Sequence, residues 1–252
     1  MKPQVAMERV NILGIGVDAV SMPQTLDWIE AAVVAATRHP RQICTANPEF
    51  VMAAQRDAEF RAVLNGADLV LPDGVGLLWA ARRQGTRLPE RVPGSDLIYR
   101  LAERAAQRGW RVYFLGAAEG VAAAAAERLQ ALYPGLVVAG TFAGEPSPAS
   151  AGALVAGVRA ARPDVLLVAY GAPAQDKWIA LHKDELGVPV SLGVGGSFDF
   201  VAGVARRAPV WMQRAGLEWL HRLWRQPWRA QRIFTAVVAF PLAVIFGGSK
   251  SD

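Results

Sequence analysis

Cysteine, histidine and clustered acidic residues are scarce in this 252-residue chain. Cys44 is the one cysteine, so an internal disulfide framework is excluded, which suits a reducing compartment such as the cytoplasm. The three histidines, His39, His182 and His221, lie far apart in the sequence. No D-x-D sequence and no cluster of His, Cys, Asp and Glu at metal-ligand spacing occurs. We therefore expect neither a metal site nor another cofactor.

Two common catalytic motifs are missing as well. The sequence has no G-x-x-x-x-G-K-S/T loop and no G-x-S-x-G elbow, so P-loop and serine-triad chemistries are poorly supported. The first apolar run follows Glu8 and Arg9 and is too short and too interrupted for a secretory signal. We expect a cytoplasmic protein.

The positive charge is concentrated near the carboxyl end. Hydrophobic residues make up 52% of the chain, enough for a substantial core, and the formal net charge is +5. From Arg206 onward there are eight basic and two acidic residues, a net charge of +6, which leaves a net charge of −1 for residues 1–205. A basic segment on a nearly neutral body indicates an anionic partner at that place, such as membrane phosphates, a lipid diphosphate or nucleic acid.

Apolar runs of strand length alternate with segments of helical periodicity through residue 205, which predicts an α/β fold. We expect a Rossmann-like parallel sheet with helices on both faces. Strands are predicted at 10–17, 42–45, 68–71, 111–115, 136–141, 164–170 and 188–194. Helices are predicted at 22–38, 74–83, 95–108 and 147–161, and Ser95 or Asp96 is the expected cap of the helix at 95–108. Residues 48–65 are predicted to form two short helices, and two further helices are predicted to end near residues 132 and 186.

After residue 205 the composition changes, so we divide the chain into a core, 1–205, and a helical appendage, 206–252. Tryptophans and arginines alternate in a helix predicted at 209–225, and Pro227 suits the first turn of a second helix that Pro241 bends or ends. Residues 233–246 carry no charge but are shorter than the ~20 apolar residues of a membrane span. This pattern favours a segment that lies on a membrane surface. The alternative is a terminal helix packed on the body.

Polar residues follow two of the predicted strands. Thr45 and Asn47 come after one strand, and Asp73 comes after the next. In an open parallel sheet, ligands bind outside the carboxyl ends of the strands, so these side chains are candidates for a site. The structural alternative is a helix cap for Thr45 and Asn47 and a simple turn for Pro-Asp-Gly.

Two glycine-containing stretches suggest nucleotide binding, each with a structural alternative. Gly14 and Gly16 resemble the start of a dinucleotide fingerprint, but the third glycine and the acid about twenty residues later are missing. Near the last strand, Gly195 would let a phosphate or ribose approach the backbone, and Asp199 could accept hydrogen bonds from ribose hydroxyls. A simple turn explains that stretch equally well.

Taken together and in order, six motifs resemble the WecG/TagA/CpsF family of bacterial glycosyltransferases. They are TANPE, LPDGVG, RVPGSD, GAPAQDKW, GVGGSFDFVAG and RAPVWMQRAGLEWLHRLWRQPWR, and the resemblance runs from about residue 9 to residue 232. One departure is visible: the family usually has Glu after the glutamine of the fourth motif, where this chain has Asp176.

The resemblance implies an inverting, metal-independent transferase on the inner face of the cell membrane. Such enzymes move a sugar, often N-acetylmannosamine, from a UDP donor to an undecaprenyl-diphosphate-linked sugar during synthesis of cell-surface polysaccharide or teichoic-acid-type polymers. Their C-terminal appendage meets the membrane and closes over the site. The donor sugar, the second sugar of the acceptor, the polymer and any homo-oligomer remain open.

Roles for individual residues also come from the resemblance. Asp73 would be the general base that takes the proton from the acceptor hydroxyl. Thr45, Asn47 and Gln175 would hold the donor, and Asp199 would bind the uridine ribose. The remaining implied residues are arginines that would hold a diphosphate and replace the electrostatic role of a metal: Arg222, Arg229, Arg232 and, with weaker support, Arg91.

Two other functions compete with this interpretation. A nicotinamide-dependent oxidoreductase would use the glycine pair at 14 and 16, but it leaves the basic tail unexplained. A nucleic-acid-binding protein would use the Arg/Trp tail, yet fourteen uncharged residues beside it are unlike a solvated nucleic-acid arm. We therefore expect no nucleic-acid partner.

Overall fold

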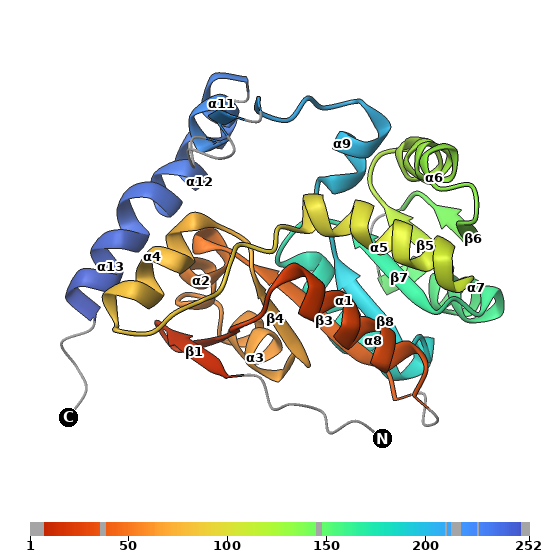
Figure 1. Cartoon of the computed structure of the whole chain (residues 1–252), viewed down its shortest axis with the longest axis horizontal. Helices are drawn as coiled ribbons and strands as arrows, with labels where there is room; N and C mark the ends of the chain where they lie inside the picture. Colours follow the sequence, from red (N-terminus) through yellow and green to blue (C-terminus); the bar gives the residue numbers. More distant parts are fainter. Residues whose placement is uncertain are drawn as a thin grey trace.

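A six-stranded parallel sheet forms the centre of the molecule (Figure 1). The computed structural model describes residues 8–35, 39–144, 148–209, 211–212, 218–225 and 227–247. The strands are β3 (Arg41–Ala46), β4 (Leu69–Pro72), β5 (Arg111–Gly116), β6 (Val137–Phe142), β7 (Val165–Ala169) and β8 (Val190–Gly193). They pair in the order β4-β3-β8-β7-β5-β6, which confirms the predicted α/β fold with a parallel sheet.

Helices cover both faces of the sheet, because successive strand residues point to opposite faces and both faces are apolar. On one face, side chains such as Ile43 and Leu69 pack with α1 (Met22–Val33), α5 (Gly94–Arg108), α6 (Val121–Leu132) and α9 (Ser197–Ala202). On the other, Cys44 and Val70 pack with α2 (Pro48–Ala54), α3 (Ala58–Gly66) and α4 (Val75–Arg83). Further along that face lie α7 (Pro148–Ala161) and α8 (Ala174–Leu186).

The first predicted strand, 10–17, is wrong, because the chain folds back on itself there. It forms an antiparallel hairpin, β1 (Arg9–Ile12) and β2 (Ile15–Asp18), outside the parallel sheet. Leu13 and Gly14 make the two-residue turn with φ of 51° and 82°, the left-handed conformation that such hairpins need. A leucine in this conformation is uncommon, so the residues at 13 and 14 did not predict the turn.

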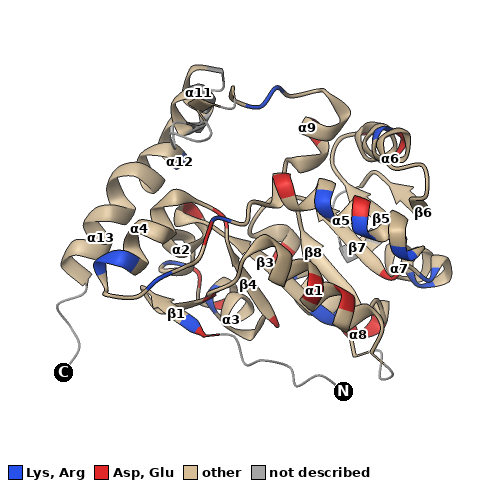
Figure 2. Ribbon diagram, in the orientation of Figure 1, with Lys and Arg blue, Asp and Glu red and all other residues tan. Residues whose placement is uncertain are grey.

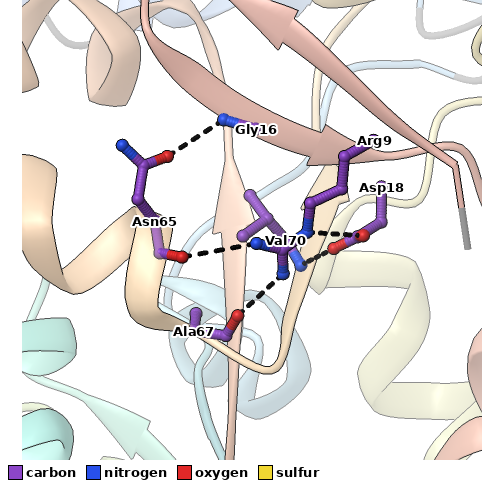
Figure 3. Close-up of polar contacts among 6 residues, drawn as sticks. All are labelled: Arg9, Gly16, Asp18, Asn65, Ala67 and Val70. Atoms are coloured by element: carbon purple, nitrogen blue, oxygen red, sulfur yellow. Dashed lines mark hydrogen bonds and ion pairs between the residues drawn. The ribbon is translucent and has the colours of Figure 1, made fainter. Parts of the chain in front are cut away.

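Hydrogen bonds join this hairpin to β4 and to the end of α3 (Figure 3). The buried carboxylate of Asp18 accepts from Arg9 Nε at 2.9 Å and from the Val70 N–H at 2.6 Å. The Gly16 N–H donates to Asn65 Oδ1 at 3.0 Å. The glycine pair therefore belongs to a hairpin and its docking, and the dinucleotide interpretation of Gly14 and Gly16 fails.

Smaller differences between the predicted and the observed elements concern the ends of helices. The helix predicted at 22–38 ends at Val33, and residues 36–38 lie outside the described residues. Neither Ser95 nor Asp96 caps α5: the helix begins at Gly94 with Pro93 at the N-cap, so both polar residues lie in its first turn. The division of 48–65 into two short helices is confirmed by α2 and α3.

Near the carboxyl end, helical structure is almost continuous. Within 209–225, where one helix was predicted, the structure describes α11 (Glu218–Arg225), whereas 210 and 213–217 are outside the described residues. A 3₁₀ turn (Pro227–Arg229) leads into α12 (Ala230–Phe234), a π-helical turn (Thr235–Ala239) and α13 (Phe240–Gly247). We call residues 230–247 the terminal helix.

Pro241 does not end this helix. The π-helical turn lies immediately before the proline, and the Phe240 N–H bonds to the Thr235 carbonyl five residues back. A proline lacks an N–H and its ring collides with a carbonyl of the preceding turn, so a locally wider turn relieves both problems. The resulting helix of 18 residues is long and apolar enough to cross a membrane by length and composition alone, with 17% of it buried.

The terminal helix has one packed face and one exposed face. Phe240 and Val244 are buried in the same cluster as the hairpin, α2 and α4. Phe234, Leu242 and Phe246 are exposed, and α13 carries no charged residue (Figure 2). The alternative of a terminal helix packed on the body thus holds for one face, whereas the predicted membrane-surface role of the exposed apolar face stays a prediction.

Candidate active site

Asp73 lies at the carboxyl end of β4, at the centre of the candidate site. Its backbone N–H donates to the Ala46 carbonyl of the neighbouring strand at 2.7 Å, which fixes the start of the turn. The Gly94 N–H, at the start of α5, approaches Asp73 Oδ2 at 3.4 Å. The side chain is half-buried, so the carboxylate is held by the fold and still borders open space.

Two glycines after Asp73 let α4 begin close against α2. Gly74 has a φ of 151°, and a Cβ added there would lie 3.2 Å from Pro48 Cδ. At Gly76 the added Cβ would lie 2.7 Å from Pro48 Cγ, a distance that real Cβ contacts essentially never show. Glycine is therefore needed at 76 for the two helices to start side by side, and this brings Asp73 near Asn47.

Thr45 and Asn47 lie on and just beyond β3, the neighbour of β4. Thr45 is 5% exposed and its hydroxyl donates to the Gly193 carbonyl at the end of β8, at 3.3 Å. Asn47 is the N-cap of α2, since its Oδ1 accepts from the Phe50 N–H at 3.0 Å. The capping alternative is thus correct for Asn47, and its amide N–H groups are the part that could donate to a ligand.

Gln175 connects the loop after β7 to the loop after β8. Its Oε1 accepts from the Gly171 N–H at 3.2 Å and from the Gly195 N–H at 3.0 Å. A Cβ added at Gly193 would lie 2.4 Å from Gln175 Nε2, so a larger residue there would displace the glutamine from its position. The glutamine is 1% exposed, so it braces the two loops that border the cavity.

A cavity of about 440 Å³ brings most of the predicted residues together at the carboxyl ends of four neighbouring strands. Ser197 and Arg206, which were not predicted as site residues, also line this cavity, as does Ser95, which was considered only as a helix cap. Arg206 was counted only in the charge of the tail. We call this space the polar cavity; the predicted residues in it are Thr45, Asn47, Asp73, Gln175, Gly195, Asp199 and Arg232.

The loop after α9 forms part of the wall of the polar cavity. Val204, Ala205 and Arg206 line it, and the next residue, Arg207, forms an ion pair with Asp96 in the first turn of α5. Both side chains of this pair are partly shielded from water. The pair therefore fastens the loop to the helix whose first residues also border the cavity.

The three implied arginines of the tail differ in what the structure describes. Arg232 borders the polar cavity, and its Nε lies 2.7 Å from Glu49 Oε2 in the first turn of α2. Arg222 lies in α11 and Arg229 in the 3₁₀ turn, but their side chains lie outside the described part of the chain. Their predicted contact with a diphosphate therefore remains a prediction.

A second cavity of about 520 Å³ lies on the other side of Asp73. Asp73 and Asn47 border both cavities, and Arg91 lines the second one and not the first. Most of the lining is apolar and comes from α4, α11 and the terminal helix. We call this space the apolar groove; it includes Val75, Trp79, Trp219, Ile233, Ala236, Val237 and Pro241.

A buried carboxyl group lies next to Gln175. Asp176 is fully buried, and neither carboxylate oxygen has a hydrogen-bond partner among the described residues. Burial raises the pKa of Asp176 from 3.8 to about 7. Burial also raises the pKa of the Cys44 thiol well above its ordinary value, and the charge of Asp176 adds to that shift. This is the position where the family usually has Glu.

Among the described residues, no group of three or more His, Cys, Asp or Glu side chains is close enough to hold a metal ion. The acidic side chains of the polar cavity are Asp73 and Asp199, and each follows a different strand. The arginines that line the polar cavity are Arg206 and Arg232.

Comparison with known proteins gives a consistent result. A Bacillus subtilis strain 168 protein is 36% identical over 194 residues, 77% of this chain and 75% of that protein, and a Staphylococcus aureus strain NCTC 8325 protein is 31% identical over 217 residues, 85% and 84%. Both are N-acetylglucosaminyldiphosphoundecaprenol N-acetyl-beta-D-mannosaminyltransferases. The model of the glycosyl transferase WecG/TagA/CpsF family matches residues 10–250, and this chain belongs to that family.

Proposed function

We propose that this glycosyltransferase moves N-acetylmannosamine from a UDP donor to a sugar linked to undecaprenyl diphosphate, with inversion and without a divalent metal. The names of the relatives support the transferred sugar and the lipid-linked acceptor. The observation that carries the proposal is the place of Asp73, whose side chain borders a polar cavity on one side and an apolar groove on the other. A transfer between a water-soluble donor and a lipid-linked acceptor needs such a junction.

In this proposal Asp73 is the general base. The acceptor hydroxyl oxygen attacks the anomeric carbon of the donor and forms the new glycosidic bond, while its proton passes to the Asp73 carboxylate. The bond from the anomeric carbon to the phosphate oxygen breaks, and its electron pair leaves with UDP. Attack from the face opposite the leaving group inverts the configuration.

The polar cavity is proposed to bind the donor. Thr45, Asn47 and Gln175 border the place of the sugar and phosphates, with Gln175 acting mainly through the loops that it braces. Gly195 has a φ of 51° and no side chain, so a ribose or phosphate can approach its backbone. Asp199 is proposed to accept hydrogen bonds from the ribose hydroxyls.

Guanidinium groups are proposed to neutralise the departing diphosphate. Arg232 and Arg206 border the polar cavity, and Arg222 and Arg229 lie on neighbouring turns of the appendage. A planar guanidinium can donate two parallel hydrogen bonds to phosphate oxygens, which makes arginine effective in this task. Arg91, in the apolar groove, is proposed to meet the acceptor diphosphate instead.

A transfer assay with purified full-length protein tests the function. We expect turnover with UDP-N-acetylmannosamine and a short-chain lipid-diphosphate-linked N-acetylglucosamine, and slower turnover with other UDP-sugars. UDP should also raise the melting temperature, because a ligand that binds only the folded state stabilises it. Stabilisation by NAD without UDP would favour the oxidoreductase, and absence of transfer to any lipid-linked acceptor would refute the proposal.

Residues 206–252 are proposed to form an appendage that holds the enzyme on the inner face of the cell membrane. Trp224, Trp228 and Phe234 are 82%, 75% and 60% exposed in or beside α11 and the terminal helix, close to the arginines of the tail. Indole rings and basic residues beside an apolar helix are typical of segments that bind the membrane surface. Residues 1–205 would then be the catalytic core.

Vesicle co-sedimentation tests the membrane proposal. We expect Trp224→Glu/Trp228→Glu to lose binding to vesicles that contain anionic lipids, because both changes put a negative charge at the surface. Leu181→Glu is the matched control, since Leu181 is 75% exposed on α8, far from the appendage in sequence. Equal sedimentation of the double variant and the control would contradict the assignment of the appendage.

A further inference from the structure

We propose that the apolar groove binds the isoprene units nearest the diphosphate of the acceptor, so that the lipid chain itself is recognised and does more than anchor the acceptor in a bilayer. This inference rests on the proposed function. It assigns a lipid-binding site to side chains for which the sequence predicted no role: Val75, Trp79, Ile233, Ala236 and Val237.

The lining of the groove suits a hydrocarbon. Val75 and Trp79 come from the exposed side of α4, and Ile233, Ala236 and Val237 come from the facing side of the terminal helix. Val75 and Trp79 are 50% and 39% exposed, although the transfer of large apolar side chains out of water is favourable. A volume of about 520 Å³ falls within the ~300–1,000 Å³ of pockets that enclose organic ligands.

The groove has a polar end at the place where the reaction would occur. Asp73 and Asn47 border it there, and Arg91 also contributes to its lining. An acceptor with its sugar hydroxyl at Asp73 and its diphosphate near Arg91 would extend its hydrocarbon towards Trp79 and the terminal helix. The lining of the groove thus combines polar and charged groups with apolar side chains, as an acceptor made of a sugar, a diphosphate and a lipid requires; the polar and charged residues are Asn47, Glu49, Asp73 and Arg91.

The exposed face of the terminal helix continues the groove outward. Val237 lines the groove and is 37% exposed, and Val238, Leu242 and Ile245 are exposed on the same helix. A chain that leaves the groove would thus meet an apolar surface and not bulk water. This continuity with an extended apolar face, together with the direct opening to Asp73, favours a lipid chain over a peptide or a second copy of the protein as the occupant.

Filling the groove provides the main test. Ala236→Trp places a large side chain in the groove, and Leu181→Trp is the matched control, because Leu181 is exposed on α8 and lines neither cavity. Each is assayed in detergent with two acceptors that share the sugar diphosphate, one with a full-length polyprenyl chain and one with a single isoprene unit. Detergent removes any effect of binding to a bilayer.

We expect Ala236→Trp to raise KM for the long-chain acceptor about tenfold or more, because contacts with several isoprene units are lost. For the single-isoprene acceptor, KM should change by less than about threefold, and the melting-temperature shift by UDP should persist. Leu181→Trp should leave both KM values within about twofold of the wild type. Val237→Asp, which puts a charge at the mouth of the groove, should act in the same direction if Ala236→Trp folds poorly.

Three outcomes would overturn the inference in distinguishable ways. If the filled variants keep the same ratio of KM values for the two acceptors as the wild type, the groove does not bind the lipid, although transfer itself still stands. If the wild type uses neither acceptor, the proposed function fails. If Ala236→Trp abolishes a concentration-dependent dimer seen by light scattering, the groove belongs to an interface between copies.

Discussion

The two cavities that meet at Asp73 are built in different ways. The polar cavity is bordered by loops at the carboxyl ends of β3, β4, β7 and β8, and Gln175 and Thr45 join these loops by hydrogen bonds. The core contributes to the apolar groove through α4, the start of α2 and the residues after β4, whereas the remaining wall comes from α11 and the terminal helix. The proposed donor half, the polar cavity, is therefore held mainly by the core, with Arg232 added by the terminal helix, whereas the proposed acceptor half, the apolar groove, forms only when the terminal helix is in place.

Hydrophobic burial holds the terminal helix in place more than charge does. Phe240 and Val244 are 0% and 6% exposed, and burying such side chains stabilises by about 1.5–3 kcal/mol each. The ion pair between Arg232 and Glu49 has side chains that are 53% and 26% exposed, and pairs at the surface contribute only about 0–1 kcal/mol. The acceptor half should therefore survive high salt and depend on apolar contacts.

The largest expected effect comes from the residue that both cavities share. Asp73→Asn should lower transfer about 10²–10⁴-fold, because the amide cannot take the proton of the acceptor hydroxyl. UDP should raise the melting temperature of this variant as in the wild type, since the donor half is intact. Asp27→Asn on α1 is the control for removal of a carboxylate. Turnover within about tenfold of the wild type would exclude Asp73 as the base.

Phe240→Ala should damage the acceptor half and spare the donor half. Phe240 is fully buried between the terminal helix and the core, so truncation should lower the free energy of unfolding by about 3–5 kcal/mol. Below the melting temperature, UDP should still bind, whereas KM for the long-chain acceptor should rise. Urea unfolding and the two-acceptor assay measure both effects. An equal loss of UDP binding would show that the two halves are not independent.

The buried carboxyl group of Asp176 should make the stability of the core depend on pH. Because burial raises its pKa to about 7, the folded protein holds a proton that the unfolded chain releases near pH 4. Stability should therefore fall as the pH rises from about 4 to about 7 and stay constant above that. Asp176→Asn removes this loss, so it should be more stable than the wild type at pH 8, by on the order of 2–4 kcal/mol, and nearly equal at pH 4.

Urea unfolding of both proteins at several pH values measures the difference. Asp184→Asn, an exposed change on the same helix, is the control and should not alter the pH dependence. If the wild type and Asp176→Asn lose stability in parallel between pH 4 and pH 7, Asp176 is not the buried acid responsible.

The smallest effects are expected from the appendage arginines. Arg229→Ala and Arg232→Ala should each lower transfer about 10–100-fold, because a charge-assisted hydrogen bond to a diphosphate contributes about 1.5–3 kcal/mol. The free energy of unfolding should change by less than about 1 kcal/mol, since the ion pair of Arg232 is exposed. Transfer rates and urea unfolding separate the two roles. A variant that unfolds would indicate that the arginine has a structural role.

Most of the fold could be predicted from local patterns, and the exceptions have a local cause. All six strands of the sheet lie within one or two residues of their predicted positions, because each is a short apolar run between turn residues. The hairpin was missed because Leu13 adopts a conformation that leucine rarely takes. Pro241 was expected to bend or end a helix that in fact continues to Gly247, since a π-helical turn accommodates it.

The residues that follow the carboxyl ends of strands could be predicted without a structure, because apolar periodicity and turn chemistry are properties of neighbouring residues. Strand order is a tertiary property: placing β8 between β3 and β7 brings Gln175 and Gly195 to Thr45, although 148 positions separate Thr45 from Gly193. Tertiary packing alone also assigned Arg91 to the groove and Arg206 to the polar cavity. The physical reason is that a cavity forms where elements distant in sequence leave space between them, and no short stretch of chain records that space.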